Sequence, residues 1–318
     1  MQPSQSSGHG RIQKNDLRTL SVFKLFPPHF FIYFLGTPNP IPQIPLGFPS
    51  GIFYVWYIMQ TIKDFLLKNF FRLLRILGIL AIIYASMVFY LKLSERHIAY
   101  PRAIENKAAR AMLPGGSERS CALGDGIALQ GWVLNDSADE TLLYYPDNNE
   151  DAAAFLAEVS SIKNVRLITF NYRGSAGNPG TPEAKYAAKD AHGIAECALA
   201  SARGGAVVIS GRGIGAAHAL NENNTVHASQ AILIDPAKST AAEIHRKYGV
   251  FFPEFIAGKG VFIREPISSP SRGIVILEDH RERSSLTAEV LRSLGNKAVY
   301  KERGGGTLAD ALSVFFDP

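Results

Sequence analysis

The sequence predicts an α/β protein with a doubly wound, mostly parallel sheet that is preceded by one transmembrane helix. Two observations lead to this fold class. From about Leu113 onward, short apolar runs alternate with segments of helical periodicity, which is typical of successive βαβ units. Upstream of them, residues 76–91 form an apolar run that contains no charged side chain.

The expected strands are short and rich in branched or aromatic residues: Arg119–Leu123, Ile127–Leu134, Thr141–Tyr145, Val165–Phe170, Ala206–Ile209, Ala231–Ile234, Ile274–Leu277 and Ala298–Lys301. The helices expected between them are Asp151–Ile162, Pro182–Ser201, Gly215–Glu222, Ala241–Lys247 and Ser285–Leu294. An Asp125-Gly126 pair separates the first two strands and predicts a hairpin turn, so the sheet should open with an antiparallel pair.

The apolar run reaches the length of a membrane span if its flanks are included. Extending it to residues 73–93 gives the roughly 20 residues that a spanning helix needs, provided that Arg75 and Lys92 snorkel. A buried core helix and a cleaved signal peptide are the alternatives. The apolar run is flanked by Arg75 and Lys92, which argues against a buried core helix. No clear small-x-small cleavage site follows it, which argues against a cleaved signal peptide, so we favour an uncleaved signal anchor.

The charge distribution supports this anchor. The chain of 318 residues has a formal net charge of +5, but residues 1–93 carry nine basic side chains against two acidic ones, and the remainder is slightly acidic. Basic residues around an apolar segment suit a membrane rather than a nucleic acid, which we do not expect as a partner. We expect the N-terminus to be cytoplasmic and the C-terminal domain to be extracytoplasmic, in the periplasm if the source is a Gram-negative bacterium.

Residues 1–58 differ in composition from the rest of the chain. They contain eight of its 18 prolines, which exclude a continuous helix through their middle. We expect translation to begin at Met59 and the upstream residues to be a doubtful leader; a genuine disordered leader is the alternative. The remaining organisation is an anchor at 59–93, a linker at 94–112 and a folded domain at 113–318.

Six segments, which together cover the chain from about Ser120 to about Asp310, resemble the α/β-hydrolase superfamily, and within it the membrane-anchored lysophospholipase and depalmitoylase branch. In chain order they read GDGIALQGWVL, LLYYPDNNED, NYRGSAGNPGTPE, VVISGRGIGAAHA, SPSRGIVILEDHRERSS and KERGGGTLADAL. The fourth, Val207 to Ala219, matches the strand, turn and helix that present the nucleophile. A dinucleotide fingerprint is the rival interpretation, but its third glycine would come one residue early and its strand would be central. No cofactor is expected.

The resemblance implies a serine, a histidine and an acid, of which only the acid has a counterpart. The Gly-x-Ser-x-Gly pattern is Gly211 to Gly215 here, with Gly213 in the serine's place. Thr307 occupies the place of the histidine, and a hydroxyl is no base near neutral pH. Glu282 aligns best with the acid, and Asp279 lies nearby. Asp147 replaces part of the oxyanion-hole loop, where a carboxylate facing the pocket would repel a developing oxyanion.

Other serine and histidine side chains are candidates to replace the missing nucleophile and base. Ser210 and Ser175 are the candidate alternative nucleophiles, and His218 and His280 the candidate bases, although ordinary structural roles are favoured for all four. No zinc-ligand spacing is present, so no metal is expected. Cys121 and Cys197 are interpreted as buried small hydrophobes, with a disulfide between them as the alternative.

These observations predict a membrane-tethered hydrolase-like protein that has lost its catalysis and binds a lipid, an acyl group or a protein partner. The expected pocket residues are Asp147, Asn148, Arg212 and Ile214. A short apolar segment, Tyr248 to Ile256, lies where active relatives carry a lid, and it is expected to cover the pocket or face the membrane. A divergent serine ester or thioester hydrolase is the alternative function.

Overall fold

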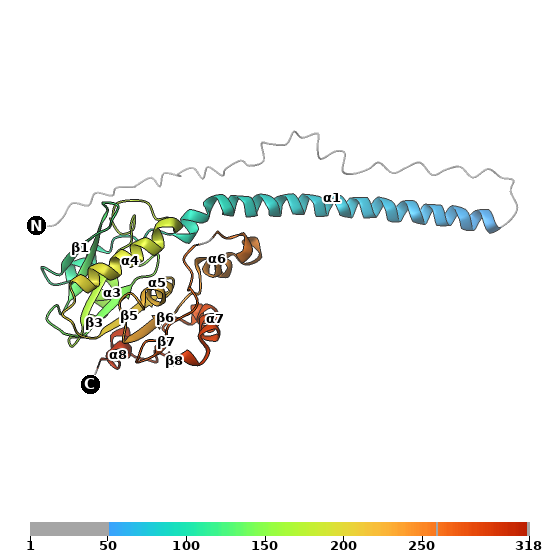
Figure 1. Ribbon diagram of the computed structural model, residues 1–318. Coiled ribbons are helices and arrows are strands. Elements are labelled where there is room, and N and C mark those ends of the chain that lie inside the picture. Colours follow the sequence, from blue (N-terminus) through green and yellow to red (C-terminus); the bar gives the residue numbers. More distant parts are fainter. Residues whose placement is uncertain (1–50, 259, 317–318) are drawn as a thin grey trace, which may run out of the picture. The chain divides into compact units, whose positions relative to one another are not determined.

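The computed structural model describes residues 51–258 and 260–316. Its centre is an eight-stranded sheet (Figure 1). The strands are β1 (Glu118–Ala122), β2 (Ala128–Leu134), β3 (Thr141–Tyr145), β4 (Arg166–Phe170), β5 (Val207–Arg212), β6 (Gln230–Ile234), β7 (Ile274–Glu278) and β8 (Ala298–Glu302). All eight strands expected from the sequence are present, with ends that shift by a few residues.

The described α-helices include the predicted apolar helix, the five helices expected within the folded domain, and two more, α2 and α8. They are α1 (Gly51–Ala99), α2 (Lys107–Met112), α3 (Ala152–Glu158), α4 (Ala184–Ala200), α5 (Gly215–Glu222), α6 (Thr240–Tyr248), α7 (Ser284–Leu294) and α8 (Leu308–Ser313). Short 3-10 turns follow α6 at Gly249–Phe251 and Glu254–Ile256, precede α7 at Arg281–Arg283, and follow α7 at Gly295–Lys297.

The strand order is β1-β2-β4-β3-β5-β6-β7-β8. β2 pairs antiparallel with both β1 and β4, and every pair from β4 to β8 is parallel. The expected hairpin turn is present, since Gly126 has a φ of 84° and its N–H donates to the carbonyl of Leu123 at 2.9 Å. The mostly parallel, doubly wound architecture predicted from the sequence is therefore confirmed.

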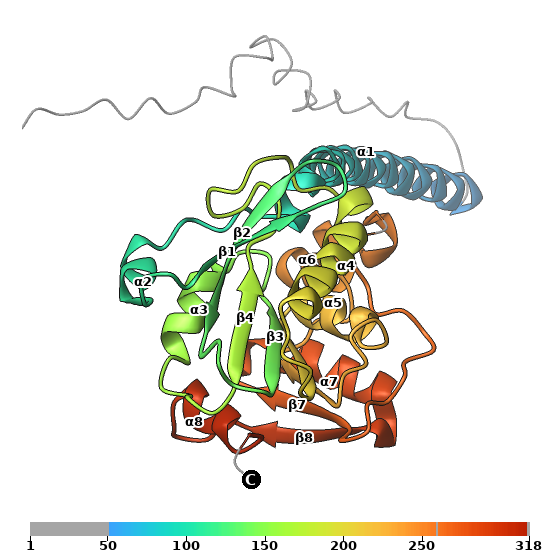
Figure 2. The same ribbon diagram turned by 60° about the vertical axis from the view of Figure 1, so that its left-hand side comes forward.

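Helices cover both faces of the sheet and complete two hydrophobic cores. β3 illustrates why, because all five of its residues are buried. Leu143 and Tyr145 point into the core formed with α4, α5 and α7, and Leu142 and Tyr144 point into the core formed with α3 and α8. Figure 2 shows these two helical layers on opposite sides of the sheet. A strand buried on both faces lacks polar alternation, as its sequence TLLYY does.

α1 is longer than the anchor that the sequence predicts. It begins at Gly51, so residues 51–58 are helical although they were assigned to the leader, and its last turns enter the expected linker. Residues 1–50 lie outside the described part of the chain, and the expectations for them remain predictions. The stretch Val55–Ala99 is long and apolar enough to cross a membrane, and nearly all of its apolar window is exposed. Residues from Phe71 onward form one compact unit that includes the sheet.

The two cysteines form a disulfide. Cys121 on β1 is bonded to Cys197 on α4, with a Cα–Cα distance of 5.8 Å. The interpretation of both residues as unpaired small hydrophobes is therefore corrected. Their separation of 76 residues hid the pairing in the sequence, because it forms only when α4 packs across the antiparallel edge of the sheet.

Candidate functional site: an ion-pair network at the carboxyl edge of the sheet

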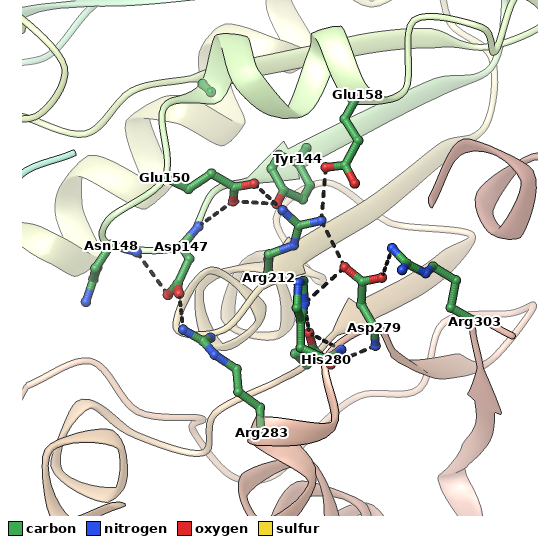
Figure 3. Close-up of polar contacts among 12 residues, drawn as sticks. Tyr144, Asp147, Asn148, Glu150, Glu158, Arg212, Asp279, His280, Arg283 and Arg303 are labelled. Carbon is green, nitrogen blue, oxygen red and sulfur yellow. Dashed lines mark hydrogen bonds and ion pairs between the residues drawn. The ribbon is translucent and has the colours of Figure 1, made fainter. Parts of the chain in front are cut away.

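Asp147 lies in the loop after β3, where the carboxyl ends of the parallel strands meet. Its side chain is almost fully buried. One carboxylate oxygen accepts the backbone N–H of Ile214 at 3.1 Å, and the other is 2.6 Å from a guanidinium nitrogen of Arg283. Arg283 also contacts Glu243 at 3.1 Å. Figure 3 shows the carboxylate of Asp147 directed toward Arg283.

Gly213 forms the tight turn between β5 and α5. It has a φ of 56°, and its N–H and C=O bond the backbone of Ile234 and Ala237, both at 3.0 Å. A Cβ atom at this position would overlap the carboxylate of Asp147 and the guanidinium of Arg283. The space above the turn is therefore filled by the ion pair between these two side chains.

Arg212, at the end of β5, is the centre of a second group of charges. Its guanidinium lies 2.5 Å from Glu150, 3.3 Å from Glu158 and 3.5 Å from Asp279. Burial opposes its charge, but the surrounding Tyr144 and acidic groups raise the pKa of Arg212 above its ordinary value. Burial also raises the pKa of Glu150, against the effect of Arg212. The hydroxyl of Tyr144 donates to Glu150 at 2.7 Å and fixes this carboxylate.

Asp279 directly follows β7, and its side chain is fully buried. It pairs with Arg303 at 2.5 Å and with His280 Nδ1 at 3.1 Å. The neighbouring carboxylate of Asp235 accepts the backbone N–H groups of Asp279 and His280 and lies 3.0 Å from His280 Nδ1. The His280 side chain is 61% exposed, so it closes the network on the solvent side.

The network lines two adjoining clefts of about 240 and 420 Å³. Asp147, Asn149, Arg246 and Arg283 line both of them. Acidic and basic side chains line both clefts, and apolar residues such as Ile98 and Ile244 line part of the smaller one. A polar or charged molecule fits such walls better than an acyl chain does.

Comparison with known proteins identifies the architecture. No family model matches the chain. An α/β hydrolase from Vibrio vulnificus superposes with a TM-score of 0.55 at 14% identity, covering 71% of this chain and 89% of that one. The chain has the α/β-hydrolase fold. An esterase from Pyrococcus furiosus superposes less closely, with a TM-score of 0.49 at 12% identity over 68% of this chain and 91% of that one.

Similarity in sequence alone extends over a shorter stretch. The uncharacterized protein Rv2307c of Mycobacterium tuberculosis is 28% identical over 131 residues, which are 39% of this chain. The chain spans about half the length of this curated relative, since the match covers 47% of it.

The α/β-hydrolase fold has a defined position for the turn between β5 and α5. Its nucleophile stands on the sharp turn between a strand and a helix, and the next backbone N–H contributes to the oxyanion hole. Here that turn is Gly213, and the N–H is that of Ile214, which donates to Asp147. The predicted pocket residues Asp147, Arg212 and Ile214 thus lie together, and Asn148 beside them donates to the carbonyl of Ala99 at 2.8 Å.

Among the described residues, no hydrogen bond joins Thr307 to either candidate acid, Glu282 or Asp279. Glu282 is exposed on the 3-10 turn before α7, whereas Asp279 is the buried carboxylate at the end of β7. Thr307 caps α8. Its hydroxyl accepts the backbone N–H of Asp310 at 3.1 Å, and the Asp310 carboxylate accepts the backbone N–H of Thr307 at 2.9 Å. Its local capping role accounts for a threonine in this place.

The proposed substitute nucleophiles are buried. Ser210 is fully buried on β5, and its hydroxyl has no partner among the described residues. Ser175 accepts the N–H of Ala103 at 2.8 Å. His218 packs against Tyr145 and Tyr172, and burial lowers its pKa to about 4. Within the described part of the chain, no histidine is hydrogen bonded to a serine, threonine or cysteine side chain.

The sequence did not single out several members of the network: Glu150, Asp235, Glu243, Arg283 and Arg303. They come from five separate loops and helices, so no local spacing marks them. Asp235, Asp279 and His280 also bring one potential metal-ligand atom each within 4.8 Å of one another. Arg212 and Arg303 already neutralise Asp279, and the backbone N–H groups satisfy Asp235, so these carboxylates are engaged without an ion.

Proposed function

We propose that this chain is a membrane-tethered α/β-hydrolase-fold protein that binds a ligand or partner without hydrolysing it. The observation that carries this proposal is the position of Asp147. Its carboxylate accepts the N–H of Ile214 and pairs with Arg283 in the space where a side chain at position 213 would stand. The machinery of acyl transfer is thereby replaced by a closed ion pair.

The electrostatics of the turn argue against an oxyanion intermediate. Hydrolysis of an ester develops a negative charge on the carbonyl oxygen, and donors aimed at that oxygen supply a large part of the catalysis. A carboxylate that already accepts the Ile214 N–H removes this donor. It also adds a like charge within hydrogen-bonding distance of the place where the oxyanion would form. Gly213 offers no attacking atom, and Thr307 offers no base.

The membrane tether rests on α1 and on the charge pattern. The exposed apolar surface of Val55–Ala99 needs a nonaqueous environment, which a bilayer supplies. The disulfide between Cys121 and Cys197 supports an extracytoplasmic position for the folded domain, because such bonds persist in oxidising compartments. This position agrees with the orientation inferred from the short basic N-terminal side.

One observation favours the alternative, a divergent serine hydrolase. Ser175 and His218 line the same small cavity, of about 30 Å³. A cavity of this size holds about one water molecule and no ester substrate. The hydroxyl of Ser175 is also engaged with Ala103. This pair therefore supports catalysis less well than the ion-pair network opposes it.

A fluorophosphonate probe tests the proposal on the full chain in detergent, with an active serine hydrolase as the positive control. We expect no covalent labelling of this protein under conditions that label the control completely. Labelling that is abolished by Ser175→Ala or by Ser210→Ala, in a variant that keeps its disulfide, would overturn the proposal and establish the alternative.

A further inference from the structure

The segment that follows α6 exposes large apolar side chains. We call Tyr248–Ile256 the aromatic loop. Val250 is 70% exposed, Phe251 is 45% exposed and Phe255 is 87% exposed. None of these three side chains lines the clefts at the ion-pair network. The aromatic loop therefore does not act as a cover for them in this structure.

The base of the aromatic loop is fixed to the C-terminal part of α1. Phe252 is fully buried and packs with Leu91 and Ile244. The hydroxyl of Tyr84 donates to the carbonyl of Val250 at 2.7 Å, and Lys92 donates to the carbonyl of Ile256 at 2.8 Å. α6 and the residues after it lie beside this end of α1 in Figure 1. The exposed side chains thus project from a segment that is held at both ends.

The hydrogen bonds from Tyr84 and Lys92 hold the aromatic loop beside the C-terminal part of the apolar run of α1. Tyr84 comes eight residues before Lys92, which corresponds to about 12 Å along a helix axis. Tyr84 lies inside the apolar run that the sequence predicts to be in the membrane, and Lys92 marks its end. A loop bonded to both residues must run alongside the last two turns of that apolar run.

The chemistry of the surroundings fits the boundary between lipid chains and headgroups. Arg246 and Lys247, on the last turn of α6, are exposed, and Glu254 is the one acid within the aromatic loop. Aromatic and aliphatic side chains next to basic residues are the composition of segments that lie in a membrane interface. The basic pair can contact lipid phosphates while the apolar side chains enter the acyl region.

We propose that the aromatic loop inserts into the leaflet from which α1 emerges, so that the domain contacts the bilayer directly at a second point. The occupant of this apolar surface is lipid, because Tyr84, which is bonded to the carbonyl of Val250, lies among exposed apolar side chains of α1 such as Ile83 and Phe89. This inference rests on the membrane tether of the proposed function. Insertion fixes the tilt of the domain, and with it the height of the charged clefts above the membrane.

Site-specific fluorescence quenching tests the insertion. The two native cysteines are bonded to each other, so an introduced cysteine is the single free thiol for an environment-sensitive fluorophore. Full-length Phe255→Cys and Phe251→Cys are labelled and reconstituted into phosphatidylcholine and phosphatidylglycerol vesicles. Some of these lipids carry a spin label near the headgroup or near the end of the chain. We expect a blue-shifted emission and strong quenching by the headgroup-proximal spin label at both sites.

Two control sites separate the possible failures. Val299→Cys lies on the exposed edge strand β8, and its label should be neither shifted nor quenched. Leu80→Cys lies on α1, and its label should be quenched by the chain-terminal spin label. If Leu80 is quenched but residues 251 and 255 behave like 299, the tether stands and the insertion is wrong. A blue shift at residue 255 without lipid quenching would assign the surface to a protein and also overturn it. If Leu80 is not quenched, the tether itself fails.

Discussion

The carboxylate of Asp147 accepts the backbone N–H of Ile214 at 3.1 Å, joining the loop after β3 to the first turn of α5. In the α/β-hydrolase fold this N–H faces the reacting oxygen of a substrate. The protein supplies its own anion to that donor and holds it with Arg283. The stability of the domain and the proposed lack of hydrolytic activity thus depend on the same carboxylate.

Removing this carboxylate should cost considerable stability. Asp147→Ala leaves the largely buried Arg283 with Glu243 as its remaining partner and leaves the N–H of Ile214 without an acceptor. We expect the free energy of unfolding to fall by about 3 kcal/mol, as is usual when a buried ion pair loses one member. Chemical denaturation of the full chain in detergent measures this change.

An exposed ion pair provides the matched control for this prediction. Lys238 and Glu289 are 3.6 Å apart and both substantially exposed. Glu289→Ala should change the unfolding free energy by less than about 1 kcal/mol. Equal losses for the two variants would show that the pair with Arg283 contributes no more than a surface pair.

Placing a serine at the turn should not produce hydrolase activity. Gly213→Ser introduces a side chain at a φ of 56° and into the space of Asp147 and Arg283. We expect a loss of about 1–3 kcal/mol of stability and no reaction with a fluorophosphonate. Gly304→Ser is the control for backbone strain alone, because Gly304 has a φ of 71° and open space around it.

The difference in stability loss between Gly213→Ser and Gly304→Ser measures the cost of the steric overlap with Asp147 and Arg283. It should shrink when Asp147 is also replaced by glycine, because the carboxylate no longer fills the space. A Gly213→Ser variant as stable as Gly304→Ser in the native background would mean that the ion pair moves aside without cost.

The sequence was sufficient to predict the sheet because its signals are local. Each strand is a short apolar run, and β3 shows no polar alternation because it is buried on both faces. The Asp125-Gly126 turn and the glycines of the β5–α5 turn are likewise recognised within a few positions. The same local signals lead to the expectation that Asp147, Arg212 and Ile214 follow neighbouring strands at one edge of the sheet, and their role as pocket residues stays a prediction.

The partners of these residues could not be predicted in the same way. Arg283 meets Asp147 across 136 positions, and Asp279 meets Arg212 across 67. Such pairs are decided by how loops from different strands converge, which no spacing in one sequence encodes. The disulfide between Cys121 and Cys197 could not be predicted for the same reason. The sequence also does not predict that α1 begins as early as Gly51, because the prolines upstream indicate an irregular leader that extends to residue 58.

The stability of the protein should depend on pH through the protonation of Glu243. Burial, reinforced by Asp147 and opposed by Arg283, raises the pKa of Glu243 from 4.5 to about 7. Between these values the native state binds more protons than the unfolded state, so the contribution of this group to stability decreases as pH rises. Glu243→Gln removes the contribution.

The stability of the wild type minus that of Glu243→Gln should therefore fall by up to about 3 kcal/mol between pH 4.5 and pH 7. The comparison of the two proteins is needed because the contribution of His218 to stability changes with pH in the opposite direction. Burial lowers the pKa of His218 to about 4, so its contribution is lost as pH falls below 6.5. A difference profile that is flat across this range would show that Glu243 is ionised normally.

The disulfide should contribute to stability through the length of the loop that it closes. Cys121 and Cys197 are separated by 76 residues, and the chain-entropy relation gives about 4.5 kcal/mol for a loop of this length. We expect the Cys121→Ser/Cys197→Ser double variant to lose an amount of this order in chemical denaturation. The native chain isolated from its own membrane should not react with a maleimide until it is denatured and reduced. Maleimide labelling of both thiols before reduction would contradict the pairing and, with it, the extracytoplasmic placement of the domain.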